Sequence, residues 1–126
     1  MKTFVRLLLA TVGTLILTSG TRAAEHRVAS LAALQERLAL LEPGDTVIVA
    51  RGTYSTTGPL VINRGGTATA PVRISAESVG AVELTGSHGF RIEAPAAHVV
   101  VEGFVFTHAS GRTAIAAGTQ HVRFTR

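Results

Sequence analysis

Residues 41–54 read Leu-Glu-Pro-Gly-Asp-Thr-Val-Ile-Val-Ala-Arg-Gly-Thr-Tyr, and they mark a junction between a helix and a series of strands. Pro43-Gly44 suits the two central positions of a type II turn, because proline presets its φ and glycine takes a positive φ. Glu42 precedes a proline, which disfavours helical backbone, so a helix before the turn is expected to stop at about Leu41. The stretch therefore predicts a change from helix to strand.

A short amphipathic helix is expected upstream of this junction. The segment from His26 to Ser30 leads into it, and serine is a good N-cap residue. Leucines at spacings of three, four and three form one apolar stripe, namely Leu31, Leu34, Leu38 and Leu41. An isolated helix of this length is marginal in water, so the stripe is expected to cover the open end of the strand stack that begins at Thr46.

Short apolar triplets recur downstream of the junction. Thr46 to Ala50 is predicted to be the first strand, and Gly52 is predicted to end it. The triplets fall into three interleaved series with a period near 22 to 25 residues. The first starts at Val47, Val72, Val99 and Val122, the second at Leu60, Val82 and Phe104, and the third at Phe90 and Thr113. Three series with a shared period predict a coil of three strands per turn.

Alternation inside the triplets supports a coil. In Val82-Glu83-Leu84 the outer residues can point inward while the glutamate faces solvent. The corners between strands are expected at glycines and small residues, namely Gly65-Gly66, Ala70-Pro71, Gly80, Gly86, Gly89, Gly103 and Gly111. An antiparallel sandwich of short strands is the alternative, since its strands recur at similar spacing. The shared period favours an all-β, right-handed parallel β-helix with an N-terminal capping helix, truncated after about three coils.

The first residues have the layout of a secretory signal peptide. Lys2 and Arg6 give a positive start, an apolar run extends from Leu7 to Leu17, and small and polar residues follow to Ala24. The run is short for a membrane span, although an uncleaved anchor is the alternative. We therefore predict a signal peptide over residues 1–23, a cap helix and turn over 24–45, and incomplete coils over 46–126. The expected location is secreted or periplasmic, without a membrane attachment after cleavage.

Composition excludes several classes of function. Three of the 12 Lys and Arg residues precede Ala24 and all 8 acidic residues follow it, which leaves nine cations against eight acids and a net charge of +1. This balance does not indicate a nucleic-acid partner. The absence of cysteine excludes disulfides, thiolate metal sites and cysteine nucleophiles. Lys2 is the only lysine in the sequence, so no lysine base is available after the predicted leader.

The histidines carry two possible interpretations. His98 and His121 begin equivalent predicted strands 23 residues apart, so their side chains are expected to lie over one another on adjacent coils. A metal pair is conceivable there, but no third ligand is placed nearby, and a stacked surface pair is favoured. His88 and His108 flank corner glycines, where a solvated loop is expected.

The charged residues favour a solvated surface over a site. Glu83 and Glu102 fall near equivalent predicted strand positions and could form a carboxylate or calcium pair, but outward-facing solvated charges are favoured. Scattered arginines could touch a polyanion only weakly on a nearly neutral domain, namely Arg73, Arg91 and Arg123. Gly65-Gly66 lacks the strand–turn–helix setting of a phosphate loop. No catalytic, cofactor-binding or metal residue is assigned.

The order of several motifs resembles the N-terminal part of the chondroitinase B and alginate lyase family, which is polysaccharide lyase family 6. The resemblance extends from about His26 to Arg126. Pro-Gly-Asp-Thr and Gly-Thr-Tyr are shared with other exported β-helix proteins, whereas two later motifs are more specific to this family. The motifs are Pro43-Gly44-Asp45-Thr46, Gly52-Thr53-Tyr54, Ala70-Pro71-Val72-Arg73-Ile74 and Val101-Glu102-Gly103-Phe104-Val105-Phe106.

The resemblance implies β-elimination on an acidic polysaccharide, either alginate or a chondroitin/dermatan-type glycosaminoglycan. In the family, a bound calcium neutralises the uronate carboxylate, a lysine takes the C5 proton and an arginine assists the leaving oxygen. Those residues lie in later coils, so none is carried over to these positions. The expected function is therefore that of the N-terminal part of an exported lyase. The alternative is an inactive, truncated β-helix remnant or a weak polyanion-binding scaffold.

Overall fold

The computed structural model describes residues 24–108 and 113–126. The predicted signal peptide and the predicted corner at Gly111 lie outside the described residues. Within the part of the chain that is described, no helix is long and apolar enough to cross a membrane.

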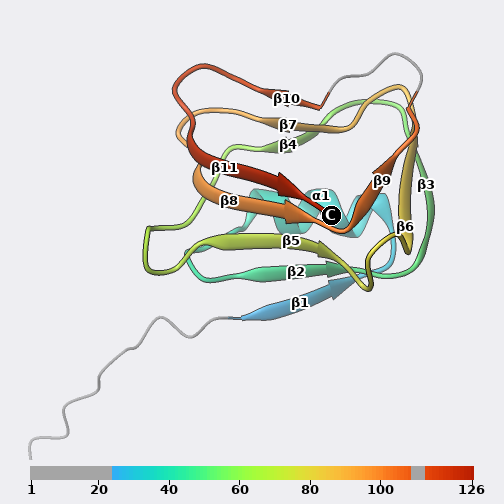
Figure 1. Ribbon diagram of the computed structural model, residues 1–126, viewed down its shortest axis with the longest axis horizontal. Helices are drawn as coiled ribbons and strands as arrows, with labels where there is room; N and C mark the ends of the chain where they lie inside the picture. Colours follow the sequence, from blue (N-terminus) through green and yellow to red (C-terminus); the bar gives the residue numbers. More distant parts are fainter. Residues whose placement is uncertain (1–23, 109–112) are drawn as a thin grey trace, which may run out of the picture.

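One helix and eleven short strands make up the described chain (Figure 1). The helix, α1, spans Leu31–Ala39. The strands are β1 (Glu25–Val28), β2 (Thr46–Val49), β3 (Gly52–Thr56), β4 (Leu60–Ile62), β5 (Val72–Ala76), β6 (Val82–Gly86), β7 (Phe90–Ile92), β8 (Ala97–Glu102), β9 (Phe104–Phe106), β10 (Ala114–Ile115) and β11 (Gln120–Thr125).

The strands form three parallel sheets around one core, so the fold is the predicted right-handed parallel β-helix. Sheet A has five strands in the order β1-β2-β5-β8-β11, sheet B has β3-β6-β9, and sheet C has β4-β7-β10. Each coil contributes one strand to each sheet in turn, which gives three complete coils from β2 to β10 (Figure 1). The prediction of about three coils with three strands each is confirmed.

The membership of the predicted series is wrong at one triplet. The sequence predicts that Leu60 shares a series with Val82 and Phe104, but Leu60 pairs with Phe90 in sheet C. The partner of Val82 one coil earlier is Gly52, in a strand that the sequence did not predict. Because each of these triplets places its outer residues toward the core, their pattern alone does not tell which sheet a triplet joins.

The first strand of the chain was also missed. Residues 25–28 pair in parallel with β2, from Glu25 opposite Thr46 to Val28 opposite Val49. Only Val28 in this strand is buried, so its sequence lacks the apolar pattern of a strand. The segment predicted as cap helix and turn thus also contributes a strand to sheet A. Gly52, predicted to end a strand, begins β3 instead.

Helix α1 has the predicted start and a slightly earlier end. The Ser30 hydroxyl accepts a hydrogen bond from the Ala33 backbone N–H at 3.1 Å, which satisfies one of the free donors of the first turn. The helix ends at Ala39 rather than at about Leu41, because the Leu40 N–H already turns back to the Arg37 carbonyl. It packs against β1, β2 and β4 and so covers one end of the coil.

The turn after the helix has the predicted geometry. Gly44 has a φ of 88°, a value that glycine adopts without steric cost. The Asp45 N–H donates to the Glu42 carbonyl at 3.1 Å, which closes the four-residue turn. The turn delivers the chain directly into β2.

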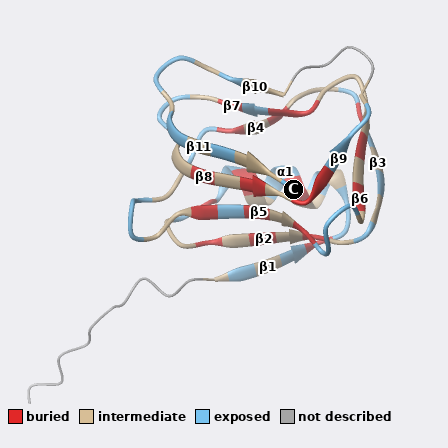
Figure 2. Ribbon diagram, in the orientation of Figure 1, coloured by how far each residue is buried: buried red, intermediate tan, exposed pale blue. Residues whose placement is uncertain are grey.

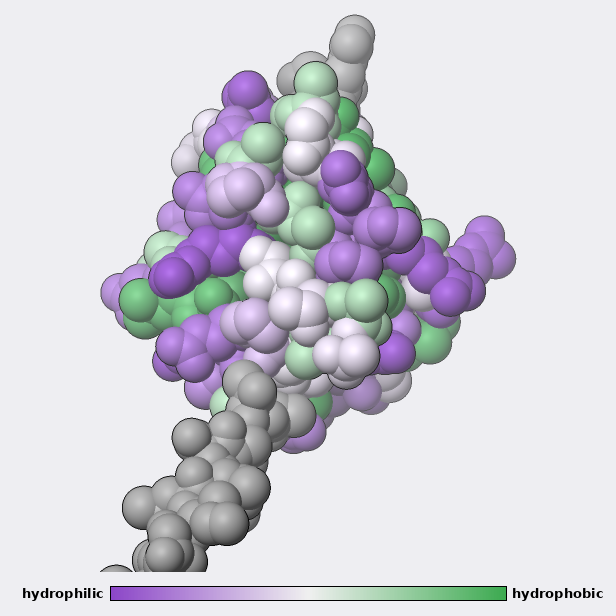
Figure 3. Space-filling view, turned by 90° about the vertical axis from the view of Figure 1, so that its left-hand side faces the viewer, coloured by the Kyte–Doolittle hydropathy of each residue, from purple (hydrophilic) through white to green (hydrophobic). Residues whose placement is uncertain are grey.

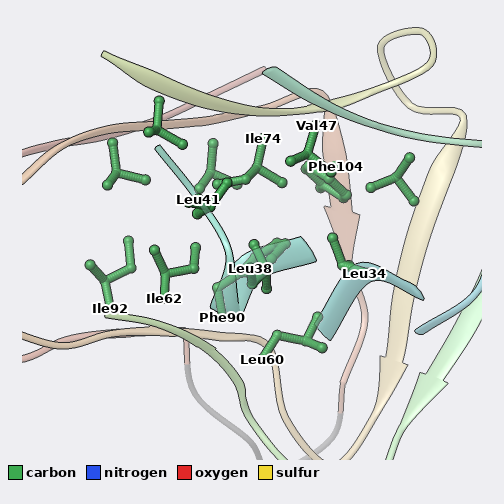
Figure 4. Close-up of a cluster of buried hydrophobic side chains, with 14 of the residues drawn as sticks. Leu34, Leu38, Leu41, Val47, Leu60, Ile62, Ile74, Phe90, Ile92 and Phe104 are labelled. Atoms are coloured by element: carbon green, nitrogen blue, oxygen red, sulfur yellow. The ribbon is translucent and has the colours of Figure 1, made fainter. Parts of the chain in front are cut away.

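The core runs through the interior of the coils (Figure 2). Leu34, Leu38 and Leu41 project from the helix segment into the same cluster as the inward residues of the three sheets (Figure 4). Phe90 is fully buried, and its ring meets that of Phe104 edge to face at a centroid distance of 5.3 Å. The predicted apolar stripe is therefore the lid of the core, as expected.

Candidate functional site

The two histidines of successive coils stack on each other, as the favoured interpretation predicts. Their ring centroids lie 4.5 Å apart, with an angle of 9° between the ring planes. His98 and His121 occupy matching positions, since the residues on either side of them pair in register across β8 and β11. Nearly parallel rings do not direct their lone pairs at one point, and the described residues contain no group of three side chains that could hold a metal ion.

The two glutamates do not occupy equivalent positions, so this part of the sequence interpretation is wrong. Glu83 lies in sheet B opposite Thr53 and Val105, whereas Glu102 lies in sheet A opposite Ser75. The Thr107 hydroxyl donates to Glu83 at 2.6 Å. Glu102 follows the Val99 triplet, which belongs to a different series from the Val82 triplet, so the series already separate the two carboxylates.

The arginines do not gather into one basic surface. Arg73 in β5 forms an ion pair with Glu102 at 3.2 Å, and Arg91 in β7 forms one with Glu93 at 2.8 Å. Arg73 and Arg123 share an outward register position in sheet A, whereas Arg91 lies in sheet C. On the face where the chain turns from sheet C into sheet A, hydrophilic groups are scattered among paler and apolar ones (Figure 3). Two of these three arginines thus have a carboxylate partner nearby, and the three do not share one face.

Sequence reasoning missed a buried carboxylate in the turn. Asp45 is only 5% exposed, and its carboxylate accepts a hydrogen bond from the Glu42 N–H at 2.9 Å. The His26 Nε2 atom in β1 lies 3.9 Å from the same carboxylate. Asp45 therefore ties the turn, and through His26 the first strand, to the coil. An aspartate directly after Pro-Gly was the available signal, because aspartate side chains commonly accept backbone hydrogen bonds in turns.

A second missed group is Glu77, at the corner after β5. It accepts from the Arg51 N–H at 3.0 Å and from the Arg27 guanidinium at 2.5 Å. The hydrogen bond from the Arg51 backbone, followed by that from Arg27, lowers the pKa of the Glu77 carboxyl. The contacts join β1, the β2–β3 corner and the end of β5, so their role is structural.

The two corner histidines are less solvated than predicted. His88 Nδ1 lies 2.7 Å from the Ser87 hydroxyl, and the carbonyl of His88 accepts from the Thr56 hydroxyl at 2.5 Å. The ring nitrogens of His108 are buried and have no partner among the residues that the structure describes. The solvated-loop expectation is therefore wrong for His108, because its ring packs edge to face against Phe106, at a centroid distance of 6.0 Å.

The described residues do not fit the calcium that the family resemblance implies. Calcium takes six to eight oxygen ligands, usually from several carboxylates and carbonyls. Asp45, Glu83 and Glu102 lie at different places in the fold, and each accepts a hydrogen bond from a protein donor. No catalytic step through a metal is derived from the described residues.

Comparison with known proteins identifies the family. The model of the Chondroitinase B family matches residues 28–121. The solved structure of the PL6 family alginate lyase AlyGC matches with a TM-score of 0.64 and 25% sequence identity, over 80% of this chain and 15% of that chain. A single-residue mutant of the same enzyme matches with the same values. A comparison with curated proteins found no match.

The match with AlyGC is confined to a small share of that enzyme, so this chain spans about one seventh of the length of the lyase that it resembles. The family match runs from the last residue of β1 to the second residue of β11, and this range includes every motif on which the sequence resemblance depends. The chain belongs to the Chondroitinase B family.

Proposed function

We propose that this chain is the N-terminal part of an exported polysaccharide lyase that cleaves uronate-containing polysaccharides by β-elimination. The single observation that carries the proposal is the family match over residues 28–121, in a chain that aligns with only 15% of an alginate lyase. The substrate would be alginate or a chondroitin/dermatan-type glycosaminoglycan. Export through the signal peptide predicted over residues 1–23 would bring the enzyme to such polymers.

The proposal gives these coils a supporting role in the reaction. β-Elimination next to a carboxylate needs a base and a group that stabilises the developing negative charge. The described residues offer no lysine, and the carboxylates of Asp45, Glu83 and Glu102 are engaged in structural contacts. The coils would instead close the N-terminal end of a longer β-helix and fix the register on which later coils stack.

Activity should be measured on the whole gene product that contains this chain, with alginate, chondroitin sulfate and dermatan sulfate as separate substrates and calcium present. The readout is the ultraviolet absorbance of the unsaturated uronate that β-elimination leaves at the new chain end. We expect the absorbance to rise with one polymer class. Absence of a rise with all three, from a folded protein, would contradict the proposal.

The control is a protein of residues 24–126 alone, tested under the same conditions. We expect it to produce no unsaturated uronate, because the proposal places the chemistry outside these residues. Turnover by the short protein would show that the chemistry resides in groups to which the proposal gives only structural roles.

A further inference from the structure

His98 and His121 share an unusual backbone conformation in addition to their stacked rings. Both have a φ of 52°, in the left-handed region that non-glycine residues rarely adopt. Their neighbours pair in register, Ala97 with Gln120 and Val99 with Val122, so the same distortion recurs at the same place in two successive coils. Backbone in such a region persists only where the surrounding structure determines it.

The ring stack is the contact that these two side chains make with each other, and its strength depends on protonation. Neutral imidazoles 4.5 Å apart and nearly parallel attract each other as other aromatic rings do. One protonated ring over a neutral one is also attractive. Two protonated rings repel, and at this separation in water the repulsion disfavours the doubly charged pair by about fivefold. Imidazole gains its proton between about pH 8 and 5.

We propose that the His98–His121 stack is a proton-sensitive clasp between β8 and β11, which holds the two coils together at neutral pH and weakens in mild acid. The clasp contributes its stability above the titration range of imidazole and loses it as the pH falls through that range. The inference does not depend on the proposed lyase activity.

The charged side chains on the elements around the clasp do not offset positive charge on the two imidazole rings. Arg73 of β5 and Glu102 of β8 are paired with each other, and Arg123 of β11 adds positive charge two residues after His121. Before β8, Glu93 is paired with Arg91. The Gly66 N–H donates to the Ala97 carbonyl. Arg64, which lies two residues before Gly66, donates from its guanidinium to the Ala39 carbonyl. Among the described residues, no carboxylate forms an ion pair with His98 or His121.

The first test is an NMR measurement of contacts between the imidazole ring protons of His98 and His121, made at about pH 7.5 and at about pH 5. We expect contacts between the two rings in the wild-type protein at the higher pH and weaker contacts at the lower pH. His98→Asn, in which His121 has no partner ring, is the control and should show no such contacts. Asparagine is chosen because it tolerates the left-handed conformation. Ring contacts of equal strength at both pH values would overturn the proposal.

The second test is hydrogen exchange of the β11 amides at about pH 7.5 and about pH 5, corrected for intrinsic rates. Between the higher and the lower pH, the β11 amides of the wild type should lose up to about fivefold more protection than the β11 amides of His121→Asn. His88→Asn is the matched control, since His88 contacts Ser87 rather than the stack, and it should behave like the wild type. Equal losses in wild type and His121→Asn would contradict the clasp.

Discussion

The two ends of the described coil differ in how far their inward-facing side chains are exposed to solvent. At the N-terminal end, α1 covers the first coil, and Leu38 is 1% exposed. At the other end, residues in equally inward positions remain accessible, with Phe106 38% and Ile115 52% exposed. The same alternating pattern thus produces core only where another layer lies over it. The apolar pattern indicates which side chains point inward. The covering layer determines how much apolar surface each of them buries, and therefore how much it stabilises the fold.

Edge strands at the two ends also differ in the side chains that they expose. β1 is the edge strand of sheet A at the capped end, and it presents Glu25 and Arg27 as exposed charges. β9, at the opposite end of sheet B, presents Val105 and Phe106. Charged residues on an edge strand discourage further pairing, whereas apolar ones permit it. β11, the other edge of sheet A, exposes His121 and Arg123, so at this end an apolar edge is seen at β9 but not at β11.

The largest expected effect comes from truncating the helix lid. Leu38→Ala should lower the free energy of unfolding by about 3 kcal/mol, because it removes a fully buried side chain and leaves a cavity. Ile115→Ala is the matched change at the open end and should cost less than about 1 kcal/mol, since half of that side chain already contacts solvent. Urea denaturation monitored by circular dichroism measures both. Equal losses of stability in the two variants would contradict the claim that the helix lid makes the two ends energetically different.

A smaller loss is expected at the turn that follows the lid. Asp45→Ala removes the buried acceptor of the Glu42 N–H and should cost about 2 kcal/mol. Asp45→Asn keeps an acceptor oxygen and should retain more of the stability. If the two variants lose the same amount in thermal denaturation, the hydrogen bond is not the reason that Asp45 matters.

The helix cap should contribute less again. Ser30→Ala removes the acceptor of the Ala33 N–H and should lower the free energy of unfolding by about 1 kcal/mol. Ser30→Asp supplies an equivalent acceptor and should be close to the wild type. The unfolding midpoint in urea decides between them, and an unchanged midpoint in Ser30→Ala would show that packing alone positions α1.

The smallest effect is a pH dependence at Glu77. The lowered pKa of this carboxyl means that its contribution is present above the usual glutamate range and is lost as the pH falls through the lowered value. Glu77→Gln should therefore flatten the dependence of the melting temperature on pH between about pH 5 and about pH 3. Glu36→Gln, on the exposed face of α1, is the control. A profile in Glu77→Gln as steep as that of the wild type would assign the acid sensitivity to other groups.

Much of the fold was accessible from the sequence because a stacked coil repeats its pattern. The period of the triplets predicted three strands per coil, and the Ser30 cap, the leucine stripe and the Pro43-Gly44 turn predicted the closed end. The assignment of Leu60 to a sheet failed because the first coil contains a strand, Gly52–Thr56, whose residues are mostly polar. β1 was missed for a similar reason, since only Val28 of its four residues is buried.

Less of the candidate site could be predicted. The spacing of His98 and His121 was enough to predict that they stack, because each follows the same corner in successive coils. The spacing did not predict their positive φ, because it does not specify the backbone conformation of a single residue within a strand. The Glu77 contacts link residues 26 and 50 positions apart in sequence, and no local pattern reveals such partners.

Amide hydrogen exchange across residues 24–126 tests the contrast between the two ends most directly. We expect the slowest exchange in β2, beneath the helix lid, and progressively faster exchange in sheet A from β5 through β8 to β11. Protection in β11 equal to or greater than that in β2 would contradict the claim that α1 closes one end of the coil and leaves the other open.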